Sequence, residues 1–282
     1  MKLPFTKMHG CGNDYIYFNC FETQISDPVS LSIDLSRPHF GIGSDGVILI
    51  CPSDVADAKM RMFNADGSEG KMCGNGIRCV GKYLYDHGMT QGRKEITVET
   101  LSGLKYLTVF ANDSGTADCL RVDMGQALLA PAAMPAYLDG SRVVNAPLTV
   151  DERVYHITCV SMGNPHCVIF LKEDIDTLDL PRIGPKFENN PLFPERINTE
   201  FVNILPNGEF KMRVWERGSG ETLACGTGAC AVGVAAVLNG YSEKGKDIIV
   251  HLRGGDLIIN YTDDTVFMTG TATTVFDGCI ER

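Results

Sequence analysis

The chain has 282 residues, of which 44% are hydrophobic and 21% charged, and its formal net charge is −10 at pH 7. These are the proportions of a globular protein long enough for two domains of about 120 to 150 residues, each with its own core. The acidic balance argues against a nucleic-acid partner, and no stretch approaches the about 18 apolar residues of a membrane span. Residues 1–10 contain no apolar signal core, so we expect a cytoplasmic protein that binds neither nucleic acid nor membranes.

We interpret the eleven cysteines as reduced thiols, because a chain without a secretion signal belongs to a reducing compartment. None of them forms a C-x-x-C pair, so the sequence predicts no zinc knuckle and no metal site. The ordinary role of such a cysteine is a small buried hydrophobe, as expected for Cys51 after the apolar run 47–50. A functional cysteine must therefore be identified by its local pattern.

In the first half, the apolar patterns predict strands and one helix. The helix runs from about Asn75 to Asp86 and ends before Gly88. The polar, small residues 112–117 are the best candidate for a linker between domains. Strands are expected at 14–19, 46–51, 58–63, 95–100 and 106–111, the last two forming a hairpin around 102–103.

The second half follows the same plan. Residues 173–197, rich in proline and charge, predict a short helix with a loop, and a longer helix is expected from about Thr227 to Leu238. Strands are expected at 154–160, 166–171, 200–205, 210–216, 247–253, 256–261, 265–269 and 273–277.

One internal repeat, with an offset of 152 residues, relates the two halves. It places Lys59-Met60-Arg61 on Lys211-Met212-Arg213 and Cys73-Gly74 on Cys225-Gly226. A single period of this length indicates a duplicated domain rather than a solenoid. We expect the two domains at 1–119 and 120–271, with the C-terminal segment 272–282 returning to the first.

The helix expected in the second half has no polar face over Ala229–Leu238, so it must be buried on all sides. Many strands and one such helix per half predict an α/β fold of two pseudo-symmetric halves, each a curled, mostly antiparallel sheet around a central helix. Gly81 and Gly233 would let the sheet approach the helix closely.

Cys73 and Cys225 each stand immediately before a glycine-rich helix start. The first N–H groups of a helix have no intrahelical acceptor and carry positive partial charge, which favours a thiolate and can bind a carboxylate. Two matched thiols suit the inversion of an α-carbon, because that reaction needs a base on one face and an acid on the other. Asn13 and Asn164, which follow glycines in the two halves, fit an amino acid substrate because their amides both donate and accept hydrogen bonds.

At this point the chain resembles the diaminopimelate epimerase family. The resemblance extends over nearly the whole sequence and rests on five motifs: His9-Gly10-Cys11-Gly12-Asn13-Asp14, Asn64-Ala65-Asp66-Gly67-Ser68, Met72-Cys73-Gly74-Asn75-Gly76-Ile77-Arg78-Cys79, Met162-Gly163-Asn164-Pro165-His166, and Glu216 to Thr222 followed by Ala224-Cys225-Gly226-Thr227-Gly228-Ala229. It implies a cofactor-independent, PLP-independent epimerase that interconverts LL- and meso-2,6-diaminopimelate in lysine biosynthesis. It also implies substrate in the cleft between the halves, and commonly a homodimer.

Carried over by motif, Cys73 and Cys225 are the expected acid–base pair. His166 and Glu216 resemble the residues that tune the two thiols. Arg217 is expected to bind the distal carboxylate through two hydrogen bonds. The full set of expected substrate-binding residues is Asn13, Asn64, Gly74, Asn75, Asn164, Asn203, Glu216, Arg217, Gly226 and Thr227.

Two positions depart from the family pattern, and two other functions stay open. Many relatives have Gln where this chain has Gly46, and an aliphatic residue where it has Cys11. A proline-type two-cysteine racemase would have the same architecture, but it has no distal ammonium and carboxylate for Arg217 and its neighbours to bind. A thiol–disulfide redox protein would use the two cysteines as a switchable pair, although the C-x-x-C pattern is absent.

Overall fold

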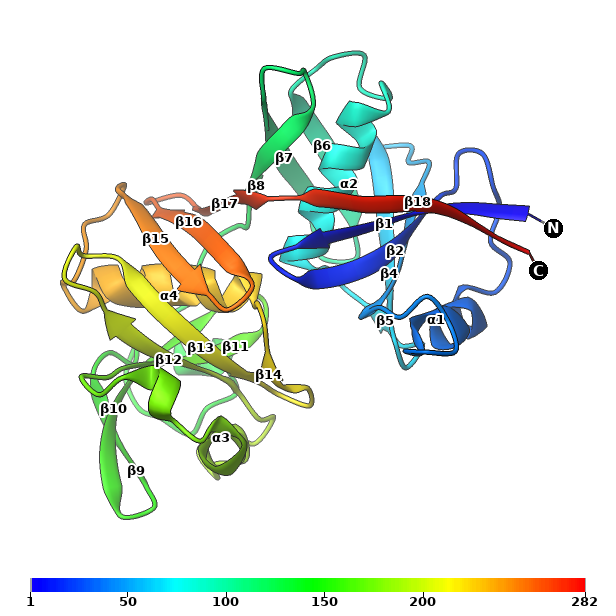
Figure 1. Cartoon of the computed structure of the whole chain (residues 1–282). Helices are drawn as coiled ribbons and strands as arrows, with labels where there is room; N and C mark the ends of the chain where they lie inside the picture. Colours follow the sequence, from blue (N-terminus) through cyan, green and yellow to red (C-terminus); the bar gives the residue numbers. More distant parts are fainter. Residues whose placement is uncertain (1, 282) are drawn as a thin grey trace. The chain divides into compact units, whose positions relative to one another are not determined.

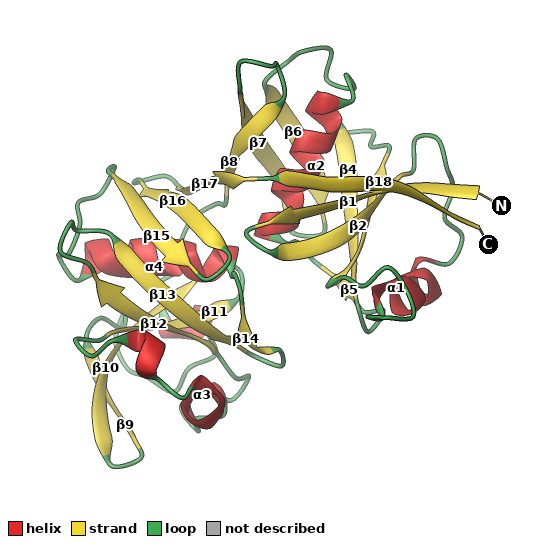
Figure 2. Ribbon diagram, viewed as in Figure 1, coloured by secondary structure: helices red, strands yellow, loops and turns green. Residues whose placement is uncertain are grey.

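The computed structural model describes residues 2–281. The chain divides into two compact units, which are shown in Figures 1 and 2 and are described separately below. Unit 1 extends to Asp123 and takes up the chain again from Thr269, whereas unit 2 is Met124–Met268. The expected domains, 1–119 and 120–271 with the segment 272–282 returning to the first, stay a prediction. Within residues 2–281, no helix combines the length and the apolar composition needed to span a membrane.

Unit 1 contains one curled sheet, in the order β18-β1-β2-β3-β4-β6-β7-β8. Neighbouring strands are antiparallel except for two parallel pairs, β2–β3 and β4–β6. The elements are β1 (Lys2–Gly10), β2 (Asn13–Asn19), α1 (Pro28–Ser36), β3 (Gly46–Cys51), β4 (Ala58–Asn64), β5 (Glu69–Gly70), α2 (Gly74–Asp86), β6 (Glu95–Thr100), β7 (Gly103–Ala111), β8 (Ala117–Asp123) and β18 (Thr273–Glu281).

Unit 2 repeats this arrangement in the order β9-β10-β11-β12-β13-β15-β16. Its parallel pairs, β11–β12 and β13–β15, correspond to those of unit 1. The elements are η1 (Pro131–Ala133), β9 (Ala146–Val150), β10 (Arg153–Ser161), β11 (Pro165–Phe170), η2 (Ile175–Thr177), α3 (Leu180–Glu188), β12 (Asn198–Ile204), β13 (Phe210–Glu216), β14 (Gly220–Thr222), α4 (Gly226–Leu238), β15 (Asp247–Leu252), β16 (Gly255–Tyr261) and β17 (Val266–Thr271).

The offset of 152 residues holds for whole elements. It carries α1 onto α3, β4 onto β13, α2 onto α4 and β6 onto β15 with identical bounds. The predicted duplication is therefore confirmed at the level of secondary structure. Because the central helices begin at equivalent positions, Cys73 and Cys225 occupy the same place in the two repeats.

A central helix lies against the inner face of each sheet, α2 against β1, β7 and β8 and α4 against β10, β16 and their neighbours (Figure 2). Glycine makes the close packing possible on α4: a Cβ on Gly233 would lie 2.6 Å from Cγ2 of Ile259. On α2, a Cβ on Gly81 would lie 2.5 Å from Cδ2 of Leu120. The expected architecture, a curled and mostly antiparallel sheet around one buried helix per half, is confirmed.

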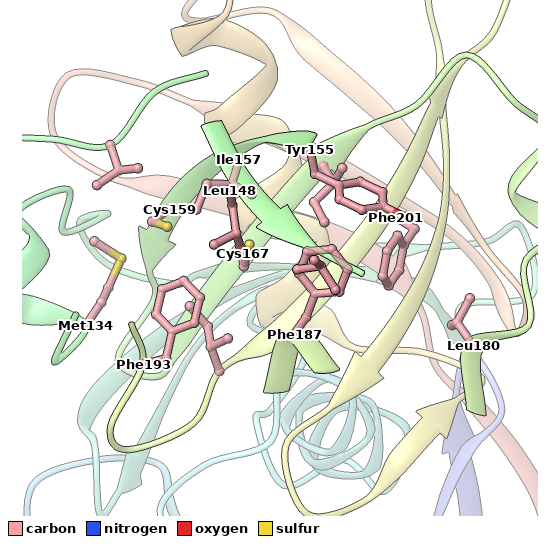
Figure 3. Packing of buried hydrophobic residues seen from close by; sticks show 14 of the residues in the cluster. Met134, Leu148, Tyr155, Ile157, Cys159, Cys167, Leu180, Phe187, Phe193 and Phe201 are labelled. Atoms are coloured by element: carbon pink, nitrogen blue, oxygen red, sulfur yellow. The ribbon is translucent and has the colours of Figure 1, made fainter. Parts of the chain in front are cut away.

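A second helix covers the outer face of each sheet. In unit 2, Phe187 of α3 packs against Phe201 of β12 with ring centroids 5.4 Å apart (Figure 3). Successive side chains of a strand point to opposite faces, so Phe201 faces α3 while Glu200 faces α4. In unit 1 the same alternation puts Val47 of β3 in the cluster with α1 and leaves Ile48 on the side of α2.

Unit 1 differs from the sequence-based expectation in several places. Helix α1 and strands β1, β5 and β8 were not predicted, and the expected linker 112–117 is instead a hairpin turn between β7 and β8 that ends at Ala117, the first residue of β8. The turn is held by Asn112, whose Oδ1 accepts hydrogen bonds from the backbone and side chains of Ser114 and Thr116. This polar composition therefore reflects an Asx-type turn.

Candidate active site

Cys73 is the N-cap residue of α2, with extended backbone dihedrals. Its Sγ accepts a hydrogen bond from the backbone N–H of Gly76 at 3.3 Å, so the sulfur replaces the usual hydroxyl or carboxylate of an N-cap. The side chain is only partly buried. A thiolate formed here would be stabilised by the same N–H group and by the helix dipole.

Asn13 is brought to Cys73 by a two-residue hairpin between β1 and β2. Cys11 and Gly12, the residues of that turn, both have positive φ, as a type I′ turn requires. The thiol of Cys73 donates to Oδ1 of Asn13 at 3.2 Å, and Nδ2 of Asn13 donates to Asp45 at 2.6 Å. Asp45 thus fixes the orientation in which the Asn13 amide meets the sulfur.

The remaining expected residues of unit 1 surround the start of α2 in different ways. Asn75 is buried, and its Oδ1 accepts from the guanidinium of Arg78 at 2.9 Å, so its backbone rather than its side chain is suited to a ligand. Arg78 also donates to the carbonyl of Gly74 and to Sγ of Cys11. Asn64, at the end of β4, donates to the hydroxyl of Ser68 at 2.9 Å.

Cys225 is the N-cap residue of α4, but its surroundings differ from those of Cys73. Only 5% of the residue is exposed, and its Sγ lies 3.5 Å from the hydroxyl of Thr227. Burial raises the pKa of this thiol well above its usual value, and the nearby carboxyl groups of Glu216 and Glu200 raise it further. The hydrogen bonds from Thr227 and from the N–H of Gly228 act in the opposite direction.

A chain of polar side chains leads from Thr227 into the core of unit 2. Nδ2 of Asn164 donates to Thr227 at 3.2 Å, and Oδ1 of Asn164 lies 3.1 Å from Nε2 of His166. Nδ1 of His166 lies 2.6 Å from Oε1 of Glu200. Glu200 was not identified from the sequence; the one available sign was a carboxylate directly before the apolar pair Phe201-Val202 of an expected strand.

Glu216 and Arg217 follow one another where β13 ends. Oε1 of Glu216 accepts from the hydroxyl of Thr222 at 2.5 Å. The backbone N–H of Arg217 donates to Oδ1 of Asn198, and its guanidinium donates to the carbonyl of Glu195, both at 3.0 Å. Within residues 2–281 the Arg217 guanidinium forms no ion pair, so it is available for an anionic ligand.

The structure corrects the assignment of Asn203. Its Oδ1 accepts from the N–H of Ile175, and its Nδ2 donates to the carbonyls of Leu171 and Glu173, so every hydrogen-bonding group of the amide is engaged in holding a loop. It lies opposite Lys211 on β13, about 17 Å along β12 from Asn198. Asn198, which the sequence analysis missed, is the asparagine of this strand that contacts Arg217.

Gly46 has no room for a side chain. A Cβ at this position would lie 2.1 Å from the carbonyl oxygen of Phe63 and 2.9 Å from the ring of Tyr15. A glutamine at position 46, which the family resemblance led us to expect, therefore cannot be accommodated with this backbone. Among residues 2–281, no group of three or more His, Cys, Asp and Glu side chains is arranged to hold a metal ion.

The family model that matches the chain and the similar curated sequences carry the same family name. The model of the family "Diaminopimelate epimerase" matches residues 5–130 and 158–275. The chain is 54% identical to a diaminopimelate epimerase of Agathobacter rectalis over 288 residues, covering 99% of both chains. It is 56% identical to one of Desulfovibrio desulfuricans over 286 residues, covering 99% of this chain and 98% of the other. Among solved structures, a hydroxyproline epimerase from Agrobacterium vitis has the same fold, with a TM-score of 0.71, 15% identity and coverage of 99% of this chain and 91% of that one.

Proposed function

Because the chain belongs to the diaminopimelate epimerase family, we propose that it interconverts LL- and meso-2,6-diaminopimelate. The observation that carries the proposal is the placement of Cys73 and Cys225 at the N-caps of equivalent helices in the two repeats. A two-base epimerisation that runs in both directions needs one group on each face that can both accept and donate a proton, and a duplicated fold supplies two matched groups.

In the proposed mechanism, the two thiols act on opposite faces of one α-carbon. The thiolate of one cysteine removes the α-hydrogen as a proton, and the electron pair remains on the α-carbon and its carboxylate. The thiol of the other cysteine then donates its proton to the opposite face. The configuration is inverted, the first sulfur is left protonated and the second as thiolate, and the reverse reaction exchanges the roles.

The helix starts would hold the carboxylate at the reacting carbon. The first N–H groups of a helix lack intrahelical acceptors, so those of Gly74 and Asn75 and of Gly226 and Thr227 are suited to an anion. Because Gly76 N–H already donates to Cys73, the same helix start stabilises both the sulfur and the carboxylate. This arrangement supports binding and charge stabilisation by the protein alone, without a cofactor.

The other groups would bind the distal end of the substrate, which carries an ammonium and a carboxylate. We assign Arg217 to the distal carboxylate, since its guanidinium can form two parallel hydrogen bonds. Glu216 and the side-chain amides of Asn13, Asn64 and Asn164 complete the proposed set. Asn198 replaces Asn203 in it, because Asn198 contacts the backbone of Arg217 whereas Asn203 holds a remote loop.

We further propose that the protein works in the cytoplasm as a homodimer, within lysine biosynthesis. The pathway follows from the substrate of the family. Analytical ultracentrifugation would test the oligomeric state: sedimentation as a 30.7 kDa species at micromolar concentration would reject the dimer.

Solvent exchange tests the function directly. The protein is incubated with LL-diaminopimelate in D2O, and the α-hydrogens are followed by NMR. We expect deuterium at the α-carbon together with conversion to the meso isomer. Proline is the matched comparison: exchange into proline but not into diaminopimelate would support a proline-type racemase instead. Exchange into neither, together with a thiol–disulfide potential near that of the cytosol, would favour the redox alternative.

A further inference from the structure

The core of unit 2 contains a buried acid–imidazole pair that the proposed mechanism does not use. His166 and Glu200 are both 0% exposed, and their Nδ1 and Oε1 atoms are 2.6 Å apart. Oε2 of Glu200 has no hydrogen-bond partner within residues 2–281. An ionised carboxylate in this position would be poorly stabilised, because only one of its oxygens is bonded.

The position of Glu200 is specific to the second repeat. A Cβ on Gly228, in the first turn of α4, would lie 2.7 Å from Oε1 of Glu200, so the carboxyl group lies directly beneath the start of the helix. In unit 1 the equivalent residue is Ile48, whose Cδ1 lies 2.6 Å from the corresponding point on Gly76. The duplication thus supplies a natural control, in which an apolar side chain occupies the same place beneath the Cys73 helix.

Because the His166–Glu200 pair is buried, the number of protons that it holds depends on the cost of leaving a net charge in the core. An ionised Glu200 beside a neutral His166 would leave an uncompensated negative charge in the core, which is costly. One added proton makes the pair neutral, either as carboxylate with imidazolium or as carboxylic acid with neutral imidazole. In both forms Nε2 of His166 carries a hydrogen, since Nδ1 faces Glu200 in each case. Burial also raises the pKa of Glu200, in agreement with a retained proton.

A hydrogen on Nε2 sets the direction of each contact that follows. His166 donates to Oδ1 of Asn164, which leaves Nδ2 of Asn164 to donate to Oγ1 of Thr227. With its oxygen accepting from Asn164, Thr227 can turn its own hydrogen toward Sγ of Cys225, 3.5 Å away. If Nε2 lacked the hydrogen, the Asn164 amide would have to turn over, and Thr227 would donate to Asn164 instead.

We propose that Glu200 is a positioning residue for Cys225: it shares one proton with His166, and through Asn164 it directs the hydroxyl hydrogen of Thr227 onto the sulfur. This inference rests on the proposed function in one respect only: the purpose of the hydrogen bond is to stabilise the thiolate of Cys225. The titratable groups that face Glu200 are His166 and Cys167 on β11, Glu216 on β13 and Cys225 at the start of α4. At Cys73 the contact runs in the other direction, because its thiol donates to Oδ1 of Asn13.

The first test needs no substrate and measures the wild-type protein, with one variant used only to assign a signal. Nitrogen-15 NMR of histidine-labelled protein reports which ring nitrogen is protonated, and the signal of His166 is assigned by its loss in His166→Gln. We expect the hydrogen of His166 to be found on Nε2, the nitrogen that faces Asn164. An unprotonated Nε2 at pH 8 would overturn the proposal, whatever the enzyme catalyses.

The second test measures the thiol. The pH dependence of iodoacetamide alkylation is followed separately on the Cys225 and Cys73 peptides by mass spectrometry, so each midpoint is independent of accessibility. The carboxyl group of Glu200 by itself raises the pKa of Cys225, but the proton shared with His166 offsets most of that charge. In Glu200→Leu the lost hydrogen bond therefore dominates. We expect the pKa of Cys225 to rise by about 1, with alkylation at pH 8 about tenfold slower, and that of Cys73 to stay unchanged.

Two further variants separate this effect from repacking. Glu200→Gln can donate from its amide to Nδ1, so it should keep most of the wild-type midpoint for Cys225. Ile48→Leu perturbs the packing beneath the other helix start and should leave the Cys73 midpoint unchanged. A Cys225 midpoint that does not move in Glu200→Leu, or that moves together with that of Cys73, would refute the positioning role. If Glu200→Leu does not fold, the NMR measurement on the wild type still decides.

Discussion

At the scale of single residues, the two candidate thiols lie in unlike surroundings within a duplicated fold. Cys73 is partly exposed and donates to Asn13, whereas Cys225 is buried and lies near two carboxyl groups. Because burial and those carboxyl groups raise the pKa of Cys225, its thiolate should form only at higher pH than the ordinary thiol. The repeat therefore supplies equivalent positions in unlike surroundings.

The first prediction concerns the need for both thiols. Replacing either Cys73 or Cys225 by Ala removes the acid or base from one face, so epimerisation should fall at least about 100-fold, the lower end of general acid–base contributions. Turnover is measured by conversion of LL-diaminopimelate, and circular dichroism checks the fold. Cys279→Ala, which changes an exposed cysteine on β18, is the matched control and should retain activity. A Cys73 or Cys225 variant that kept more than about a hundredth of the wild-type rate would contradict the two-base mechanism.

Arg217 should determine substrate choice. If it binds the distal carboxylate away from water, Arg217→Met should cost about 2–5 kcal/mol, which lowers kcat/KM for diaminopimelate about 30- to several-thousand-fold. Lysine lacks that carboxylate, so it should be a very poor substrate for the wild type and lose almost nothing further in the variant. Arg253→Met removes an exposed arginine that pairs with Glu221 and should change neither value. An equal loss on both substrates would show that Arg217 supports the fold rather than selecting the ligand.

At the scale of elements, the central helices depend on glycine at equivalent places but with different tolerance. A Cβ at Gly81 would meet the flexible ends of two leucines, Cδ2 of Leu120 at 2.5 Å and Cδ2 of Leu107 at 2.8 Å, which can move away. A Cβ at Gly233 would meet Cγ2 and Cβ of Ile259, a branched side chain that belongs to a paired strand. The second contact can be relieved only by shifting the helix or the strand.

We therefore predict unequal effects of the same substitution. Gly233→Ala should lower the free energy of unfolding by about 1–3 kcal/mol, the usual cost of overpacking a core. Gly81→Ala should be close to neutral, because the ends of Leu120 and Leu107 can change rotamer and alanine favours the helix by about 0.5–1 kcal/mol over glycine. Urea denaturation of both variants provides the comparison. Equal destabilisation would show that the identity of the facing side chain does not decide the cost.

At the scale of the whole molecule, the duplication gives each unit one thiol at the start of its central helix. Each unit has its own sheet, core and outer helix. The proposed two-base reaction would draw one thiol from each unit.

Oxidation should reveal the cooperation of the two thiols. If they act on one α-carbon, an oxidant should be able to link Cys73 to Cys225 when no substrate is bound, with loss of activity that dithiothreitol restores. Peptide mapping of the inactive protein identifies the bond. Substrate should protect against inactivation. Cys159 and Cys167 lie opposite one another on β10 and β11. If the inactive protein contained a bond between these two cysteines instead, the loss of activity would come from that pair and the prediction would be wrong.

The sequence by itself determined the duplication, the two central helices and the cysteines at their starts. These features are local or repeat in register, so they can be recognised without knowing any tertiary contact. They are the apolar segment 229–238, the glycine-rich helix starts and the offset of 152 residues. The outer helix α1 escaped detection because it is short and its apolar pattern is weak.

Only the tertiary structure decided which polar residues surround each thiol. Asn203 and Asn198 lie on one strand and look alike in sequence, but one amide is used up by a loop at residues 171–175 and the other supports Arg217. Glu200 could not be distinguished from a surface carboxylate until β11 and β12 paired in parallel and placed it beside His166 beneath α4. The physical reason is the same in each case: the partners of a buried polar group come from segments distant in sequence, so the identity of the hydrogen bond is a property of the fold.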